Sequence, residues 1–563
     1  MNKNNFLKSG KRAMCIGLSV LLCGAATACG GTNEDEHSDK TILNIGNLDA
    51  GLGHKWLEAV AKEFETAYAD YQGEDGKVGV HVEITNKLDE YHSASLSQNM
   101  PTNGNDLYVI VSDYISPLIS AGVLADMTDA LEEKVYKADG SLAGEGETAT
   151  LSILDKMRPE GKLAFNTSKT EDETYYAMPY YATLNGAIYD ADLFNSKKLY
   201  FKADGTVGAT YADVLAKNCG AGPDGTLGTY DDGLPATWND FVVLMSAMTK
   251  RGVTPFMWSG QYMYQRSNFF NALWASYEGG NDYALNYSFE GHDEDLNIDV
   301  EETTAWKLQN QWGKLAAFTA VEDIMSNSAY YSPDAMDGTT SHTGAELLYV
   351  SSISTDKPIA MLLENSYWEN EANDEGYFDR MQKINSDWGY GKRDFRMMPI
   401  PRFENMKTSE GTVIPNQLND KNTFVCNDMS KNFLCVSKHS KNLDLAYDFL
   451  QFIHSREMLV LRTQYTSAWS PFEFHFTDEE KANSTKFVQN LSTIMTDENT
   501  EIIYPVLTSQ LRIANETTFL YWAMGVRDAF SEFYNDKSGK ITADSLFEAV
   551  QNRYSENNTI WTR

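Results

Sequence analysis

Residues 40–71 decide the fold, and they read KTILNIGNLDAGLGHKWLEAVAKEFETAYADY. The first part predicts a strand, because apolar Ile42 and Leu43 lie in a short run that ends in a polar turn. The second part predicts a helix, because its apolar residues recur at the spacing of one helix face: Trp56, Leu57, Val60, Phe64 and Tyr68. A strand followed by a helix is the repeating unit of α/β folds.

Two further strands are predicted downstream of this unit. Residues 78–85, VGVHVEIT, alternate between apolar and polar, and residues 106–113, DLYVIVSD, form the continuous apolar run of a buried parallel strand. This order predicts a parallel sheet with helices on its faces, in which ligands bind beyond the carboxyl ends of the strands. The polar and aromatic residues that follow these strands are candidate ligand contacts: Asn47, Asp49, His54, Asp113 and Tyr114.

The N-terminal residues have the order of an export signal. Four basic residues and the apolar stretch 13–28 precede Cys29, and this stretch is shorter than the roughly 20 residues of a membrane-spanning helix. Ala26-Thr27-Ala28 fits ordinary secretion, whereas the same tripeptide with Cys29 resembles a bacterial lipobox, although Ala26 stands where leucine is usual. The polar stretch that follows favours the lipobox. We therefore expect a signal peptide over 1–28, lipidation of Cys29, and a flexible tether over 29–40 that anchors the chain outside the cytoplasm.

Composition limits the classes of partner and site. A chain of 563 residues predicts two or more lobes, and a formal net charge of −34 disfavours binding to nucleic acid. Beyond Cys29 only Cys219, Cys426 and Cys435 remain, so the chain is no disulfide scaffold. Cys426 and Cys435 either bridge a hairpin or stay as buried thiols. Aromatic residues make up 12% of the chain, and tyrosine and tryptophan suit the flat faces and hydroxyl groups of sugars.

A family resemblance rests on five stretches. Residues 175–194, YYAMPYYATLNGAIYDADLF, resemble a signature of the extracellular solute-binding proteins of ABC importers, of the maltodextrin-binding type. Four other stretches are similar to this family in the expected order: 105–129, 233–256, 357–372 and 441–472. One departure is ENSYW at 364–368, where a glycine often precedes the aromatic residue.

The resemblance implies the two-lobed, type II fold of periplasmic binding proteins. Each lobe would be a mixed, mainly parallel sheet flanked by helices, with an N-terminal lobe of 41–184 plus 399–468 and a C-terminal lobe of 185–398 plus 469–563. Hinge crossings are expected near 182–187, 396–402 and 468–471. Such a monomer would capture a carbohydrate, an oligosaccharide in the first instance, by closure of a cleft and deliver it to the permease subunits. It would require no cofactor and carry out no catalysis.

The resemblance also points to residues at the crossings and strand ends as ligand contacts. These candidates are Tyr180, Tyr181, Thr183, Asn185, Trp258, Tyr262, Tyr367, Trp368, Trp469, Tyr521 and Trp522. Each has a structural alternative, and helical spacing around Trp522 makes core packing an equal interpretation. Arg396 and Arg402 offer charge for an anionic ligand, but the aromatic residues outnumber them and favour a neutral saccharide.

Residues 222–233, GPDGTLGTYDDG, lie in one of several stretches that exceed the family's usual length. Asp224, Asp231 and Asp232 between glycine turns resemble an oxygen-rich calcium loop, although the spacing does not match an EF-hand. The alternative is a surface hairpin held by Asx turns. We therefore expect either a structural calcium ion in this loop or a hairpin that needs no ion.

Three further classes of function share these features. A glycoside hydrolase needs two carboxylates across the scissile bond, and 80 acidic residues make such a pair uninformative. A carbohydrate receptor or adhesin without transport, or a chemosensory receptor, would use the same fold. Hydrolysis of an oligosaccharide would distinguish the enzyme, and uptake after deletion of the gene would distinguish the receptor and the sensor from a transport protein.

Overall fold

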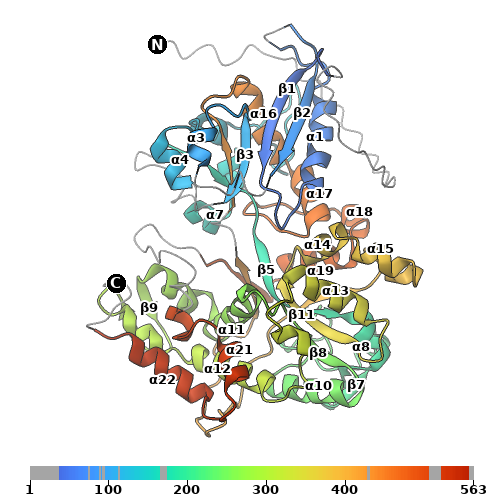
Figure 1. The fold of residues 1–563 in the computed structure, drawn as a ribbon, viewed down its shortest axis with the longest axis vertical. Coiled ribbons are helices and arrows are strands. Elements are labelled where there is room, and N and C mark those ends of the chain that lie inside the picture. Colours follow the sequence, from blue (N-terminus) through green and yellow to red (C-terminus); the bar gives the residue numbers. More distant parts are fainter. Residues whose placement is uncertain are drawn as a thin grey trace. The chain divides into compact units, whose positions relative to one another are not determined.

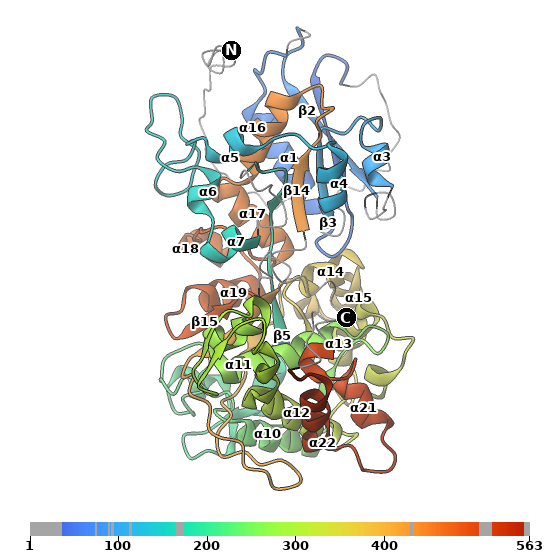
Figure 2. The same cartoon turned by 90° about the vertical axis from the view of Figure 1, so that its left-hand side faces the viewer.

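The computed structural model describes residues 37–73, 76–87, 91, 95–111, 115–164, 174–427, 432–505 and 521–556 (Figures 1 and 2). The residues of the expected signal peptide, Cys29 and most of the expected tether lie outside the described residues, as do Asp113 and Tyr114. The chain divides into two compact units. Unit 1 takes the residues up to Tyr180 with Ser430–Tyr465 and Ser470–His475, and unit 2 takes Tyr181–Met429, Thr466–Trp469 and the residues from Phe476 onward.

The sheet of unit 1 has the strand order β2-β1-β3-β14-β4. Its strands are β1 (Thr41–Asn47), β2 (Val80–Asn86), β3 (Leu107–Val111), β4 (Met178–Pro179) and β14 (Asn432–Val436). β1 runs parallel to β2 and β3, while β14 is antiparallel to β3 and β4. The predicted βαβ order is therefore confirmed, and the two antiparallel strands make the sheet mixed.

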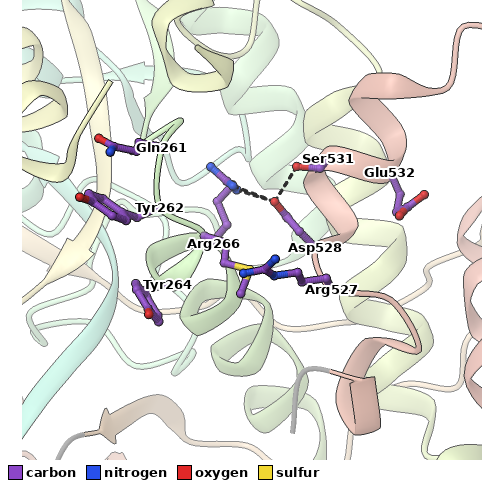
Figure 3. A pocket seen from close by; sticks show the side chains of 9 residues that line it. Gln261, Tyr262, Tyr264, Arg266, Arg527, Asp528, Ser531 and Glu532 are labelled. Atoms are coloured by element: carbon purple, nitrogen blue, oxygen red, sulfur yellow. Dashed lines mark hydrogen bonds and ion pairs between the residues drawn. The ribbon is translucent and has the colours of Figure 1, made fainter. Parts of the chain in front are cut away.

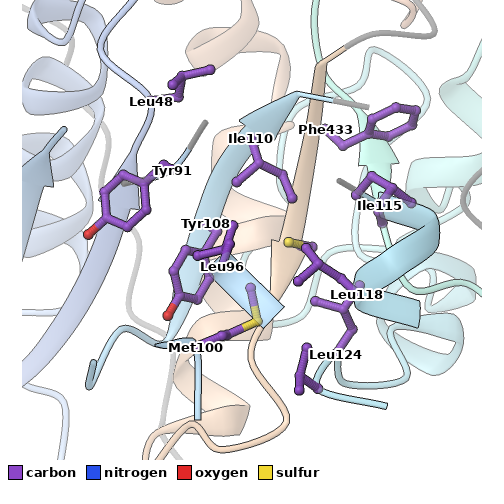
Figure 4. Packing of buried hydrophobic residues seen from close by; sticks show 13 residues of the cluster. Leu48, Tyr91, Leu96, Met100, Tyr108, Ile110, Ile115, Leu118, Leu124 and Phe433 are labelled. Carbon is purple, nitrogen blue, oxygen red and sulfur yellow. The ribbon is translucent and has the colours of Figure 1, made fainter. Parts of the chain in front are cut away.

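Helices cover both faces of this sheet. On one face α1 (Lys55–Ala67) lies against α16 (Leu443–Ile453), and the Phe64 ring meets Phe449 and Phe452 edge-on at 5.0 and 5.3 Å. On the other face Tyr108, Ile110 and Phe433 join a buried cluster with residues of α3 and α4 (Figure 4). The other helices of the unit are α3 (Leu96–Asn99), α4 (Ile115–Ala121), α5 (Thr128–Glu132), α6 (Ile153–Lys156), α7 (Pro159–Ala164) and α17 (Arg456–Thr466).

The sheet of unit 2 has the order β15-β13-β5-β11-β8, and β12 also pairs with β5. Its strands are β5 (Thr183–Asp190), β8 (Thr254–Met257), β11 (Ile359–Asn365), β12 (Phe395–Met398), β13 (Asn422–Asn427) and β15 (Thr500–Ile503). Every residue of β5 and β11 is buried, which fits central strands covered on both faces. β5 is antiparallel to β11, β12 and β13, whereas β8 is parallel to β11.

The longest helix of unit 2 is α11 (Tyr264–Ser288), which bends at Gly279, where a φ of 76° suits only glycine. It packs beside α12 (Trp312–Met325), and α12 in turn lies against α21 (Ala529–Asn535) and α22 (Ala543–Arg553) (Figure 2). The other helices are α8 (Ala191–Lys197), α9 (Tyr211–Leu215), α10 (Trp238–Lys250), α13 (His342–Ser352), α14 (Trp368–Asp374), α15 (Tyr377–Gln382), α18 (Asp478–Ala482) and α19 (Lys486–Thr496). Two small hairpins, β6–β7 (Tyr200–Phe201, Val207–Ala209) and β9–β10 (Gly291–Asp293, Ile298–Val300), complete the unit.

The unit boundaries differ from the expected lobes by a few residues at 181–184, 466–468 and 470–475, and over one longer segment. Residues 399–429 were expected in the N-terminal lobe, with a crossing near 396–402. Because β13 pairs with β5 and β15, and β12 pairs with β5, these residues belong to unit 2.

Two observations concern the cysteines and the membrane. Cys219, Cys426 and Cys435 are buried thiols rather than halves of a disulfide, so Cys426 and Cys435 do not bridge a hairpin.

None of the helices in the described part of the chain combines the length and apolar character needed to cross a membrane.

Candidate functional site

One edge of the unit 2 sheet gathers the carboxyl ends of β8 and β11 and the amino end of β5. β8 and β11 are parallel, with Met257 opposite Leu362, so their carboxyl ends meet at the same edge. β5 runs in the opposite direction, and its Asn185 stands opposite Asn365 at the end of β11. The segments that leave this edge therefore begin side by side.

Amide groups connect these segments. The Asn268 side chain on α11 donates a 3.0 Å hydrogen bond to Oδ1 of Asn185, and Asn185 Nδ2 donates to the Thr183 carbonyl at 3.1 Å. Asn365 Nδ2 donates to the Tyr367 hydroxyl at 2.8 Å. Thr183 and Asn185 are almost fully buried, so they support the edge from within.

A hollow of about 380 Å³ opens beside this edge, between the segment that follows β8 and the start of α21 (Figure 3). Tyr262 and Tyr264 lie on one side of it and remain 36% and 47% exposed. Arg527, Ser531 and Glu532 come from the other side. Gln261, Met263, Arg266 and Asp528 complete its lining.

A buried ion pair forms the floor of the hollow. Arg266 Nε and Nη2 donate to one oxygen of Asp528 at 3.0 and 2.7 Å, and Nη1 donates to the Ser259 carbonyl. Ser531 Oγ adds a 2.6 Å hydrogen bond to the same Asp528 oxygen. Because Asp528 also caps α21 by accepting from the Phe530 amide, the pair fixes α11, α21 and the segment after β8 together.

The hollow can bind a polar ring, because its lining combines exposed aromatic rings with side chains that form hydrogen bonds. Two exposed aromatic faces can stack on a ring, while an exposed guanidinium, a carboxylate, a hydroxyl and an amide can hydrogen-bond its substituents. The rigid pair beneath holds these groups in place without occupying the space above. Of the residues predicted from sequence in unit 2, Tyr262 lies in this hollow.

Three predicted tryptophans are buried in the core of unit 2. Trp258 packs against Phe256, Tyr331 and Phe530, and Trp368 meets Tyr349, Phe395 and Phe487 with no exposed area. Trp522 donates its indole N–H to Asn286 at 3.0 Å. Packing in the core, the alternative to ligand contact, explains the positions of these rings. Neighbouring Tyr521 stacks under the Arg553 guanidinium, 4.2 Å from its ring centre.

Tyr181 is the first residue of unit 2, and Trp469 is the last residue of the short unit 2 segment Thr466–Trp469. Ala182 and Trp469 exchange backbone hydrogen bonds of 3.3 and 2.9 Å, and the Trp469 ring stacks on Phe476. Tyr181 is 8% exposed and Trp469 is 2% exposed.

In unit 1 Asn47, Asp49 and His54 lie at or just after the end of β1, and Tyr180 ends the first segment of the unit. Asn47 donates to the Asn86 side chain at 2.9 Å, linking the ends of β1 and β2. The Asp49 carboxylate lies 3.1 Å from His54 Nδ1, at the start of α1, and both side chains are about one-third exposed. Tyr180 is buried, stacked on Trp56, and its carbonyl accepts from Arg462. The structure thus brings Asp49 and His54 together at the carboxyl end of β1.

The loop with the three predicted calcium ligands is held by hydrogen bonds. Asp231 is fully buried and accepts from Thr229 Oγ1, Asn422 Nδ2 and the Asp224 amide, and burial raises its pKa to about 6. One oxygen of Asp224 and one of Asp232 are buried without a hydrogen-bond partner. Within the described residues no three acidic, histidine or cysteine side chains are gathered closely enough to hold a metal ion.

Sequence reasoning missed most of the hollow. Tyr264 is two residues from Tyr262 in an aromatic, polar segment, and this repetition was the available signal. Arg266 and Asp528 are separated by 262 positions, and nothing local in the sequence indicates that they pair.

Comparisons with known proteins identify a family and a set of solved structures with a similar fold. A family model described as bacterial extracellular solute-binding protein matches residues 59–486. No curated protein sequence matches the chain. Solved structures with the same fold include the solute-binding protein RafE in complex with raffinose. RafE is 13% identical in sequence, and the match covers 91% of this chain and 98% of that chain with a TM-score of 0.51.

Two other structures are equally similar. A chitin oligosaccharide binding protein has 13% identity, covers 93% of this chain and 100% of its own, and gives a TM-score of 0.51. A probable secreted solute-binding lipoprotein from Streptomyces coelicolor has 11% identity and a TM-score of 0.51. The match covers 92% of this chain and 99% of that chain. At these identities the likeness concerns the fold.

Proposed function

The chain belongs to the bacterial extracellular solute-binding proteins, which are not enzymes, and from this premise we propose that its solute is a neutral carbohydrate. The observation that carries the proposal is the hollow of unit 2, with the exposed rings of Tyr262 and Tyr264 on one side. Sugar rings present C–H faces to aromatic residues and hydroxyl groups to polar ones. The proteins named above with raffinose and chitin oligosaccharide bind ligands of this class.

The polar groups of the hollow favour a neutral ligand over an anionic one. Arg266 is occupied by Asp528, and the exposed Arg527 is accompanied by Glu532 in the same lining. A site for phosphate or a sugar acid would instead need unpaired positive charge. A guanidinium and a carboxylate together suit a pair of hydroxyl groups, because one donates and the other accepts.

The proposed cycle is capture and delivery. The solute would contact both units, and their closure on it would be driven by tighter binding in the closed state. An ABC permease would receive the loaded receptor, which acts as a monomer. We propose that a diacylglyceryl group on Cys29 holds the receptor at the outer face of the membrane, with residues 29–40 as the tether.

Titration calorimetry on residues 33–563 tests the proposal. The panel contains raffinose, maltodextrins, chitin oligosaccharides, glycerol phosphate and a short peptide, and the recovered sugar is analysed for cleavage. We expect saturable binding of at least one neutral oligosaccharide, left intact. Binding of glycerol phosphate or the peptide alone would reject the neutral carbohydrate, and cleaved sugar would reject a receptor without catalysis.

A further inference from the structure

His342 connects the hollow of unit 2 to the helices α13 and α14. It is the first residue of α13, its ring centre lies 5.6 Å from that of Tyr262, and the two ring planes are tilted by 53°. Its Nε2 lies 3.2 Å from Glu371 Oε1 on α14. One imidazole therefore contacts both an exposed ring of the hollow and a carboxylate that is largely buried.

The backbone that carries Tyr262 is fixed by the segment that precedes α13. The Thr340 carbonyl accepts from Ser259 Oγ and from the Gln261 amide, both at 3.0 Å. Ser259 Oγ in turn accepts from the Tyr262 amide at 3.1 Å. Gly260 permits this close approach, because a Cβ there would lie 2.1 Å from a carbonyl oxygen of the segment before α13. These contacts determine where the Tyr262 side chain begins.

The orientation of the Tyr262 ring, by contrast, depends on packing. Its hydroxyl forms no hydrogen bond to another of the described residues, and Tyr262 is 36% exposed. A side chain held only by its backbone samples several staggered rotamers and loses that freedom when it binds a ligand. The contact with His342 restricts the ring in advance, so less conformational entropy is lost on binding.

His342 can restrict Tyr262 because its own ring is restrained. The Glu371 carboxylate lies at ion-pair distance from Nε2 and raises the pKa of His342, which favours the charged, paired ring. Ser341 caps α13 by accepting from the Gly344 amide at 3.0 Å, and this cap fixes the helical turn in which His342 is the first residue.

We propose that His342 is a positioning residue of the solute site: paired with Glu371, its ring holds the Tyr262 ring in the orientation that stacks on the solute. This inference rests on the proposed function, since it assumes that Tyr262 contacts the solute. His342 does not line the hollow itself, so it acts through Tyr262. Loss of the His342 ring should therefore weaken binding only while Tyr262 is present.

A double-mutant cycle on residues 33–563 tests this dependence by calorimetry, with each neutral oligosaccharide of the panel that binds the wild type. His342→Gln removes the ring and His342→Phe keeps one. His292→Gln is the matched control, since the His292 side chain on β9 is 41% exposed and lies 2.8 Å from Asp299.

We expect His342→Gln to raise Kd roughly fourfold and His342→Phe roughly twofold at most, because an aromatic pair is lost in the first and kept in the second. The control should leave Kd unchanged. In the Tyr262→Ala background, His342→Gln should have no further effect on Kd.

A second measurement needs no solute. With ¹³C-labelled tyrosine, NMR relaxation reports the fast mobility of the Tyr262 ring, whose signal is identified by its loss in Tyr262→Phe. We expect this ring to be more mobile in His342→Gln than in the wild type, in His342→Phe or in the His292→Gln control. A second ringless variant, His342→Leu, is measured in the same way and replaces His342→Gln if that variant does not fold.

Three results would overturn the proposal. The first is an undiminished affinity of the ringless variants, and the second is an equal loss of affinity with and without Tyr262. The third is an unchanged mobility of the Tyr262 ring in both ringless variants. If no carbohydrate of the panel binds, the proposed function fails, whereas the relaxation measurement still decides whether His342 orders Tyr262.

Discussion

Arg266 and Asp528 form the buried connection on which the hollow of unit 2 rests. Both donors of the guanidinium edge converge on one oxygen of Asp528, at 3.0 and 2.7 Å, and the two side chains are 5% and 10% exposed. The pair joins the start of α11 to the start of α21, and residues on either side of it line the hollow. Its role is therefore to position the binding groups.

Asp528→Ala is predicted to destabilise unit 2 by about 3–5 kcal/mol, because it leaves the Arg266 charge buried without its partner. Arg266→Met with Asp528→Asn is predicted to recover part of this loss, since no charge is then stranded. Urea denaturation monitored by tryptophan fluorescence measures both. If the single and the double variant were equally unstable, the stranded charge would not explain the effect, since the double variant strands no charge and its asparagine at 528 can still cap α21.

Glu369 predicts a pH dependence of stability. It has no exposed area, one oxygen accepts a 2.7 Å hydrogen bond from Thr485, the other has no partner, and burial raises its pKa to about 7. Since the folded state holds this proton more tightly than the unfolded state, its contribution is fully present below about pH 4.5 and is lost as the pH rises to about 7. The loss amounts to about 3 kcal/mol.

Glu369→Gln removes this titration while keeping the acceptor for Thr485. We expect the fall in the free energy of unfolding between pH 4.5 and pH 7 to be about 3 kcal/mol smaller in the variant than in the wild type. Glu290→Gln serves as the control, because its side chain is exposed. Parallel pH profiles for wild type and Glu369→Gln would show that folding does not raise the pKa of Glu369.

Local pattern was enough to predict much of the fold. The helix predicted from Trp56, Val60 and Phe64 is α1, whose buried face carries those residues, and the apolar run at 106–113 contains β3. Residues 399–429 were assigned to the wrong side of the division, because their place depends on β13 pairing with β5 across more than 200 positions. Such long-range pairing has no local signal.

The candidate site was less predictable, since residue type does not separate a core ring from an exposed one. Trp258 and Trp368 meet the same sequence criterion as Tyr262, yet packing encloses both tryptophans while Tyr262 reaches solvent. Their position relative to the strand ends was predicted, but the direction of each side chain depends on neighbours far along the chain.

Calcium removal provides a prediction for the loop at 222–233. Because hydrogen bonds from Thr229, Asn422 and the Asp224 amide occupy Asp231, we expect a chelator to leave the melting temperature of residues 33–563 unchanged. Asp231→Ala should lower it, since the buried Asn422 amide loses its acceptor at a cost of about 1–3 kcal/mol. A melting temperature that rises with added calcium and falls with chelator would show that the unpartnered oxygens of Asp224 and Asp232 hold the ion.

The two exposed tyrosines carry the last prediction. Tyr262→Ala and Tyr264→Ala should each weaken binding of the solute identified by calorimetry by about tenfold, because stacking on one ring contributes about 1–1.5 kcal/mol beyond burial. Tyr534→Ala is the matched control, since Tyr534 is 39% exposed on α21 but does not line the hollow. Calorimetry and melting temperature are measured for all three variants, so that loss of affinity is separated from loss of stability. If only the control variant lost affinity, the solute would bind elsewhere in unit 2, and the hollow would lose its assigned role.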